Sequence, residues 1–154
     1  MGGNNSSVAD VRRTIREVTA YAEFVELAPY PDDAEEAWGI GDRRDVLCEA
    51  LLAYSLLAIR RLDDFLKSRR QKDDDIIAPD LEIDLEYVLG DEGALLSEET
   101  RDLVNKSAAH LTNRGLVETW DREMDLGALL EEKMNVFERL TTELDAISGK
   151  EIEC

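Results

Sequence analysis

Apolar residues recur every three or four positions along most of the chain, which is the pattern of amphipathic helices. The first such stripe runs from Val8 to Val25 and predicts a helix over about residues 7–27. Pro29 and Pro31 follow it, and each proline disfavours helical backbone geometry at the residue before it. The first helix is therefore expected to end before this pair of prolines.

A second helix is predicted over about residues 42–69, with Asp42 as its N-terminal cap. From Val46 to Ile59 it is apolar on almost every side, and its second half is amphipathic. A helix that is apolar all round is usually enclosed by its neighbours. We expect this long helix to be the central element of the fold.

Two further helices are predicted towards the C-terminus. Ser97, followed by two acidic residues, is a favourable start for a helix over 97–113. The last helix is expected to begin near Trp120 or Asp121 and to end at about Ile147, before Gly149. Its predicted buried stripe consists of Leu126, Leu130, Met134, Phe137, Leu140, Leu144 and Ile147.

Residues 70–96 form an irregular connection in this scheme. Within it, residues 81–87 alternate strictly between apolar and polar, as in a strand with one wet face. No partner strand is visible elsewhere, and an isolated strand is not stable. We therefore expect an extended packing segment or a short helix at 81–88, with strand pairing across a dimer as the alternative.

Together these elements predict an all-α fold, an antiparallel four-helix bundle with a long central helix and an irregular connection over 70–96. The length suits one domain. We assign residues 1–6 to a disordered N-terminus, 7–149 to the helical-bundle domain and 150–154 to a C-terminal tail.

The chain is strongly acidic, with 36 Asp and Glu against 18 Lys and Arg and a net charge of -18. Such a surface repels phosphate backbones, which disfavours RNA or nucleotide binding unless positive charge is gathered locally. Lys67, Arg69, Arg70 and Lys72 form one such group. These cations either cover the last carbonyl groups of the second helix or bind phosphate.

The sequence predicts a cytoplasmic protein without metal or cofactor. No long apolar run indicates a membrane span, and the first residues lack the features of a secretion signal. Cys48 and Cys154 show neither disulfide-framework nor metal-ligand spacing. Both cysteines are expected to be free thiols.

His110 is the single histidine and the main candidate for proton transfer. Lys106 lies one helical turn before it, whereas Asn105 lies on another side of the same helix. A site would need groups from another helix, for which Arg61, Asp63 and Asp64 are the candidates. An Asp bonded to the imidazole would fix its tautomer and raise its pKa. The alternatives are that His110 and Asn105 fix helix register and that the Asp pair is solvated or paired with arginines.

Residues 58–66 (AIRRLDDFL) and 105–112 (NKSAAHLT), together with an all-helical pattern, resemble the HEPN-type helical domains of bacteria and archaea. The resemblance implies a bundle, often dimeric, of the kind found in toxin–antitoxin and phage-defence systems, whose active members are metal-independent ribonucleases. His110 would match the signature histidine and Lys106 the polar position. Asn105 stands where the catalytic members carry Arg, so charge stabilisation would fall to Lys106, Arg114 or a partner chain.

We therefore expect a non-catalytic interaction module that forms a homodimer and binds a partner protein or a nucleotide. Arg61, Arg69, Arg70 and Arg114 are its candidate binding residues. The small residues Ser107 and Ala108 would let helix 97–113 approach a second copy closely. Two alternatives remain, namely a metal-independent endoribonuclease with a composite dimer site around His110 and a purely structural or regulatory helical protein.

Overall fold

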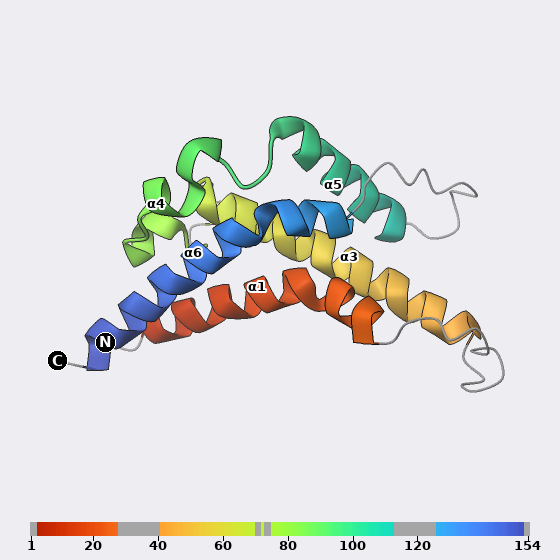
Figure 1. Ribbon diagram of the computed structural model, residues 1–154, viewed down its shortest axis with the longest axis horizontal. Coiled ribbons are helices and arrows are strands. Elements are labelled where there is room, and N and C mark those ends of the chain that lie inside the picture. Colours follow the sequence, from red (N-terminus) through yellow and green to blue (C-terminus); the bar gives the residue numbers. More distant parts are fainter. Residues whose placement is uncertain (1–2, 28–40, 70–71, 73–74, 113–125, 153–154) are drawn as a thin grey trace.

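The structure, a computed structural model, describes residues 3–27, 41–69, 72, 75–112 and 126–152. Its four long helices are α1 (Gly3–Leu27), α3 (Gly41–Leu66), α5 (Glu98–Thr112) and α6 (Leu126–Ile152) (Figure 1). The described residues contain no strand. The predicted all-α class is confirmed.

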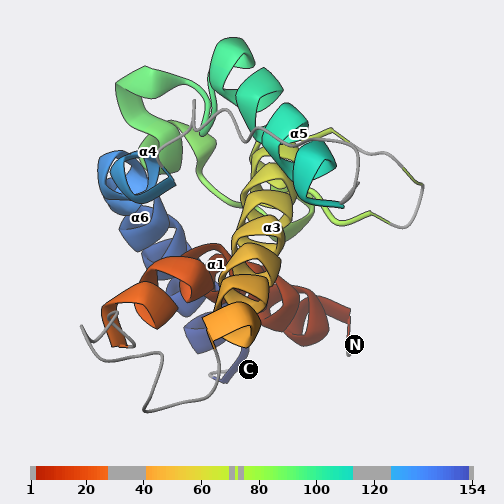
Figure 2. The same ribbon diagram turned by 90° about the vertical axis from the view of Figure 1, so that its right-hand side faces the viewer.

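The long helices are inclined to one another and enclose one core (Figure 2). α1 packs mainly on α3, α5 packs on another part of α3, and α6 packs on α1. The start of α1 and the end of α6 lie at the same end of the molecule (Figure 1). There Arg12 of α1 donates to Asp145 of α6 at 2.5 Å.

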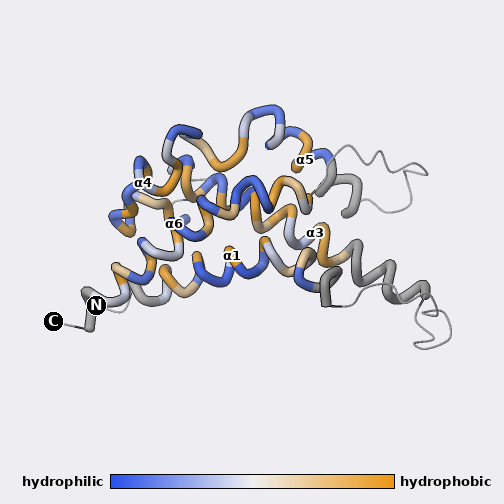
Figure 3. The backbone as a smooth tube through the Cα atoms, viewed as in Figure 1, coloured by the Kyte–Doolittle hydropathy of each residue, from blue (hydrophilic) through white to orange (hydrophobic). Residues whose placement is uncertain are grey.

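The core is built from the apolar stripes of these helices (Figure 3). Burial of these side chains removes apolar surface from water, which stabilises the folded state by roughly 25 cal/mol per Å² of buried apolar area. The largest fully buried side chains are Val18, Leu56, Ile59, Leu62, Leu66, Val88, Leu95, Leu96, Val104, Val136, Leu140 and Leu144.

α1 ends at Leu27, as the stripe predicts, but it begins at Gly3 rather than at residue 7. The first residues, which we assigned to a disordered terminus, include a helical turn from Gly3 onwards. Extending an existing helix adds one hydrogen bond for each residue fixed, so weak helix formers can continue a helix that the core already stabilises.

α3 ends at Leu66, earlier than the predicted residue 69. Ser68 adopts a left-handed conformation with φ 55°. The Ser68 amide donates to the Phe65 carbonyl at 3.2 Å and the Arg69 amide to the Asp64 carbonyl at 2.9 Å. This pair of bonds is the Schellman arrangement that ends helices, here with serine in place of the usual glycine.

The connection before α5 contains two 3-10 turns, η1 (Ala78–Leu81) and η2 (Gly90–Glu92), and the short helix α4 (Leu85–Leu89). Asp84 caps α4, because its side chain accepts a hydrogen bond from the Tyr87 amide at 3.0 Å. The short helix is thus confirmed. The strand alternative for 81–88 is wrong, since Glu82 turns the chain in a left-handed conformation and α4 follows.

α5 starts as predicted, with the Ser97 hydroxyl accepting a hydrogen bond from the Thr100 amide at 3.1 Å. The predicted start of the last helix, at residue 120 or 121, lies outside the described residues. Within them, α6 begins at Leu126. α6 continues through Gly149 to Ile152, so Gly149 does not end it. Glycine within a helix costs about 1 kcal/mol but does not forbid helical geometry.

Candidate functional site

Asp63 and Asp64, the candidate acids of α3, are both bound by Arg101 of α5. Arg101 Nη1 donates to Asp63 Oδ2, and its Nη2 donates to Asp64 Oδ1 at 2.5 Å. The Asp63 side chain is 0% exposed and that of Arg101 is 10% exposed. The guanidinium therefore joins α3 to α5 within the protein interior, as a charge-assisted fork with one carboxylate on each nitrogen.

Lys67 and the backbone of Leu96 complete this acid–arginine cluster. Asp63 Oδ1 accepts a hydrogen bond from the Leu96 amide at 3.0 Å, and Lys67 Nζ lies 3.3 Å from Asp63 Oδ2. Lys67 Nζ also donates to the Leu96 carbonyl at 2.9 Å. Both oxygens of Asp63 thus have protein partners, which offset the cost of removing a carboxylate from water.

Arg101 remains a cation in this cluster. Burial acts to lower the pKa of its guanidinium, but hydrogen bonds from Arg101 to Asp64 and Asp63 and their negative charges outweigh that effect, so the pKa is raised. The cluster therefore acts as a fixed ionic contact between two helices.

The other predicted residues of the proton-transfer site lie further along α5. Position 110 follows Arg101 by nine residues, or about 13.5 Å of helix, and its side chain lies outside the described residues. Asn105 is half-buried, and its Oδ1 has no hydrogen-bond partner in the part of the chain that the structure describes. Lys106 is exposed.

Two of the four predicted binding arginines are described, and they lie in different ion pairs. Arg61 of α3 lies 3.4 Å from Glu17 of α1. Arg69 lies 3.3 Å from Glu98, at the start of α5. Arg70 and Arg114 lie outside the described residues.

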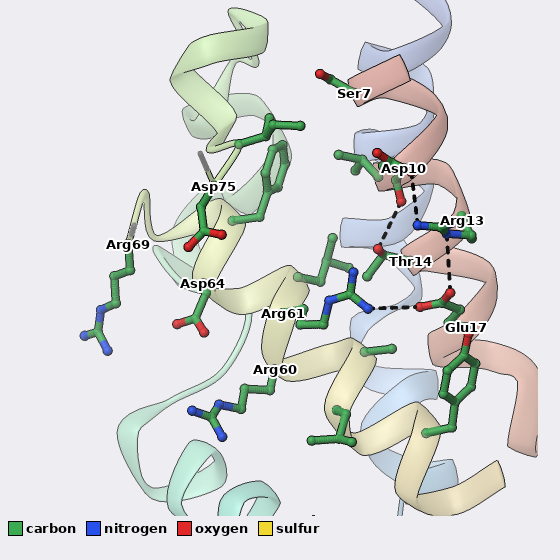
Figure 4. A pocket seen from close by; sticks show the side chains of 17 residues that line it. Ser7, Asp10, Arg13, Thr14, Glu17, Arg60, Arg61, Asp64, Arg69 and Asp75 are labelled. Carbon is green, nitrogen blue, oxygen red and sulfur yellow. Dashed lines mark hydrogen bonds and ion pairs between the residues drawn. The ribbon is translucent and has the colours of Figure 1, made fainter. Parts of the chain in front are cut away.

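A cleft of about 660 Å³ separates parts of α1 and α3 (Figure 4). Its lining includes the arginines Arg13, Arg60, Arg61 and Arg69 and the exposed apolar side chains of Tyr54 and Leu57. The sequence predicted that α3 would be enclosed on almost every side here, and Tyr54 and Leu57 correct that prediction. Neighbouring helices cover only part of the circumference of α3.

Glu17 of α1 is contacted by two arginines of this cleft. It is held by Arg13 at 3.5 Å and Arg61 at 3.4 Å, as the dashed lines in Figure 4 show. Its side chain is only 10% exposed. A hydrogen bond with Glu17, together with partial burial and the charge of Glu17, raises the pKa of Tyr54 above its ordinary value of 10.0.

The described residues hold neither a metal-binding cluster nor a membrane-spanning helix. They contain no group of three or more His, Cys, Asp or Glu side chains placed to hold a metal ion. Within the same part of the chain, no helix combines the length and apolar character needed to cross a membrane.

Arg101 is the site residue that sequence analysis missed, although the sequence carries a signal for it. Positions 101, 104, 108 and 111 follow one another at spacings of three and four, so Arg101 continues the apolar stripe of α5. On α3, Asp63 stands beside Ile59, Leu62 and Leu66. Opposite charges placed on two buried stripes indicate an ion pair between those helices.

No family model, curated protein or solved structure matches the chain. The assignment of a function therefore depends on the residues and contacts of this protein alone.

Proposed function

We propose that the protein is a non-catalytic helical interaction module, similar to HEPN domains, that pairs with a second copy and binds a partner protein or a nucleotide. The antiparallel four-helix bundle is the arrangement that we propose for its long helices. The observation that supports a role without catalysis is the engagement of Asp63 and Asp64 by Arg101.

Proton transfer by His110 would need an acid to orient the imidazole, and the acids of α3 were the candidates. In the acid–arginine cluster, both oxygens of Asp63 already bind protein groups. Using Asp63 for catalysis would require breaking a buried ion pair, which costs about 3–5 kcal/mol. Asn105 stands where the resemblance implies an arginine in catalytic members, and this also favours a role without catalysis.

The proposed dimer uses α5. Among the described helices α5 packs mainly on α3, and Figures 1 and 2 show it at the edge of the molecule. The small residues Ser107 and Ala108 favour close approach of another helix, although their side chains lie outside the described part.

The test of catalysis uses purified full-length protein with end-labelled tRNA and a mixed RNA pool, without added metal, beside His110→Ala. We expect no cleavage by either protein. Cleavage that disappears in His110→Ala would overturn the proposal and establish a metal-independent ribonuclease with a composite site. Thermal unfolding of both proteins, monitored by circular dichroism, provides the check that each is folded.

The test of the dimer is sedimentation velocity at micromolar concentration. We expect a species of about twice the 17.4 kDa chain mass. Hydrogen exchange measured at high and low protein concentration then locates the interface. We expect amides of α5 to exchange more slowly at high concentration and those of α1 to exchange at the same rate at both. A monomer at micromolar concentration would contradict the dimer.

A further inference from the structure

We propose that the cleft between α1 and α3 binds an acidic amphipathic helix from a partner protein. This inference rests on the proposed role as an interaction module, and it names the surface and the partner chemistry. The cleft is lined by both helices and extends from Ser7 and Asp10 of α1 to Tyr54 and Leu57 of α3.

Tyr54 and Leu57 give the cleft an exposed apolar edge. They are three residues apart on α3, about one helical turn, and are 45% and 40% exposed. Single exposed apolar residues are common, but a neighbouring pair that lines a cleft offers surface for a partner to bury. Apolar side chains spaced three or four apart on a partner helix match such an edge.

The charged groups of the cleft differ in their exposure to solvent. The carboxylates of Glu17 and Asp64 are only 10% and 12% exposed, because Arg61 and Arg13 contact the first and Arg101 of α5 binds the second. The guanidinium side chains of Arg13 and Arg61 are both 59% exposed, so they reach the rim. Asp10 is the acidic exception at the rim, where it lies 3.1 Å from Arg13.

Arg60 of α3 and Arg69, which follows the end of α3, also line the cleft and add positive charge to it (Figure 4). The Arg69 side chain is 50% exposed, whereas Arg60 is half-buried and has no ion pair within the described part of the chain. On a protein of net charge -18, a rim of exposed arginines is the surface where an acidic partner meets the least repulsion. Arginine is also the cation most often found in the centres of protein interfaces.

A partner helix fits these features better than RNA does. A phosphate backbone that entered the cleft would approach the carboxylates of Glu17, Asp64 and Asp75, which all line it. It would also leave Leu57 without an apolar contact. An acidic helix places apolar side chains on the edge formed by Tyr54 and Leu57 and its carboxylates against the arginine rim.

The experiment measures peptide binding to the full-length protein by fluorescence anisotropy. The probe is a labelled synthetic peptide of about 20 residues, long enough to form a helix, with Leu at every third or fourth position and Glu on both sides of that stripe. Matched peptides replace either all Glu by Lys or all Leu by Ser, and a single-stranded RNA of equal length is the fourth probe. We expect the Leu/Glu peptide to bind about tenfold or more tightly than each of the other three.

Four protein variants assign the binding to the cleft. Leu57→Ser and Arg60→Ser alter the cleft, and each is expected to weaken binding of the Leu/Glu peptide about tenfold. Met134→Ser, at a residue 43% exposed on α6, and Arg16→Ser, outside the cleft on α1, are the matched controls. Both controls should bind within about twofold of the unmodified protein.

The proposal is overturned if the Lys peptide binds as well as the Glu peptide, or if the cleft variants bind like their controls. Tighter binding of RNA than of the acidic peptide, lost in Arg60→Ser, would overturn it in favour of a nucleic-acid ligand. His110→Ala should bind the peptide like the unmodified protein. Failure here therefore remains distinguishable from RNA cleavage, which would overturn the proposed function itself.

Discussion

At the scale of single residues, two buried cations differ in the exposure of their partners. Arg101 binds Asp63, which is 0% exposed, and Asp64, whose side chain is 12% exposed. Lys133 of α6 binds Glu92 and Glu132, whose side chains are 40% and 65% exposed. A carboxylate that cannot return to water loses much more when its cation is removed.

We predict that Arg101→Met lowers the free energy of unfolding by about 3 kcal/mol, the lower end of the range for breaking a buried ion pair, because the buried Asp63 carboxylate loses the guanidinium and keeps only Lys67 as a cation. Urea unfolding followed by circular dichroism measures this change. Lys106→Met, at an exposed position of the same helix, should change stability by less than about 0.5 kcal/mol. Equal effects of the two substitutions would show that the ionic contact between α3 and α5 contributes little.

Lys133→Met should behave differently, with an unfolding free energy within about 1 kcal/mol of the unmodified protein at pH 7. Methionine keeps the apolar stem of this position, which is 8% exposed, while Glu92 and Glu132 regain contact with water. The same urea titration tests this expectation. A loss as large as that in Arg101→Met would contradict the argument from partner exposure.

The contribution of Lys133 also predicts a pH dependence. Burial lowers the pKa of Lys133, but hydrogen bonds to Glu132 and Glu92 and their charges outweigh it, so the pKa is raised above 10.5. A raised folded-state pKa stabilises the protein fully below the unfolded pKa, and this stabilisation disappears as the pH rises through the folded pKa. The stability of the unmodified protein relative to Lys133→Met should therefore fall above about pH 10.5. Tyr54 titrates in both proteins, and its effect cancels; a constant difference from pH 8 to 11 would contradict the prediction.

At the scale of elements, the buried stripe of α6 was predicted correctly at every position except one. The sequence predicted Met134 as its third member, yet Met134 is 43% exposed and Lys133 is buried. The spacing alone would have indicated position 133, since intervals of four and three residues alternate along the helix only if 133 replaces 134 in the stripe. The stripe then reads 126, 130, 133, 137, 140, 144 and 147. The prediction chose Met134 over Lys133 because methionine is apolar. It was wrong because Lys133 forms an ion pair with Glu92 of η2, which is far away in the sequence.

Two glycines beside η2 provide an element-scale prediction. Gly90 and Gly93 have φ of 56° and 65°, which costs a residue with a side chain about 1–2 kcal/mol. A Cβ at Gly90 would also lie 2.8 Å from Nη1 of Arg139, whereas a Cβ at Gly93 would meet nothing within 4 Å. Gly90→Ala should therefore destabilise the protein more than Gly93→Ala in thermal unfolding. Arg139 Nη1 also donates to the Tyr87 carbonyl at 3.2 Å, and the reverse order of stabilities would contradict the prediction by showing that Arg139 moves aside at no cost.

At the scale of the whole molecule, the charge of -18 is the dominant long-range term. Acidic groups repel one another across the folded surface, and salt screens that repulsion over about 10 Å at 0.1 M. We predict that the thermal unfolding temperature rises when NaCl is increased from about 0.01 to 0.5 M. Glucose at equal osmolality is the control for effects of the solute other than charge. A fall in unfolding temperature with salt would show that attractive surface pairs outweigh the net repulsion.

The sequence could predict which residues of the candidate site share one helix, but not which residues of different helices contact each other. The sequence singled out Asp63, Asp64 and Arg61 of the central helix, but it did not identify the residues that they contact. Arg101 follows Asp63 by 38 residues, and no local pattern states which two helix faces meet. The cleft was missed for the same reason, since the exposure of Tyr54 and Leu57 depends on which neighbours cover α3.

The sequence by itself determined the all-α class, the end of α1, the capped start of α5 and the acidic surface. These follow from local geometry: period, capping hydroxyl, proline and charge act within a few residues. Only the tertiary structure decided that Arg101 joins α3 to α5, that Lys133 is buried, and that a cleft rimmed by arginines opens beside Tyr54. Those features depend on which helix faces meet, which is fixed by the packing of the whole core.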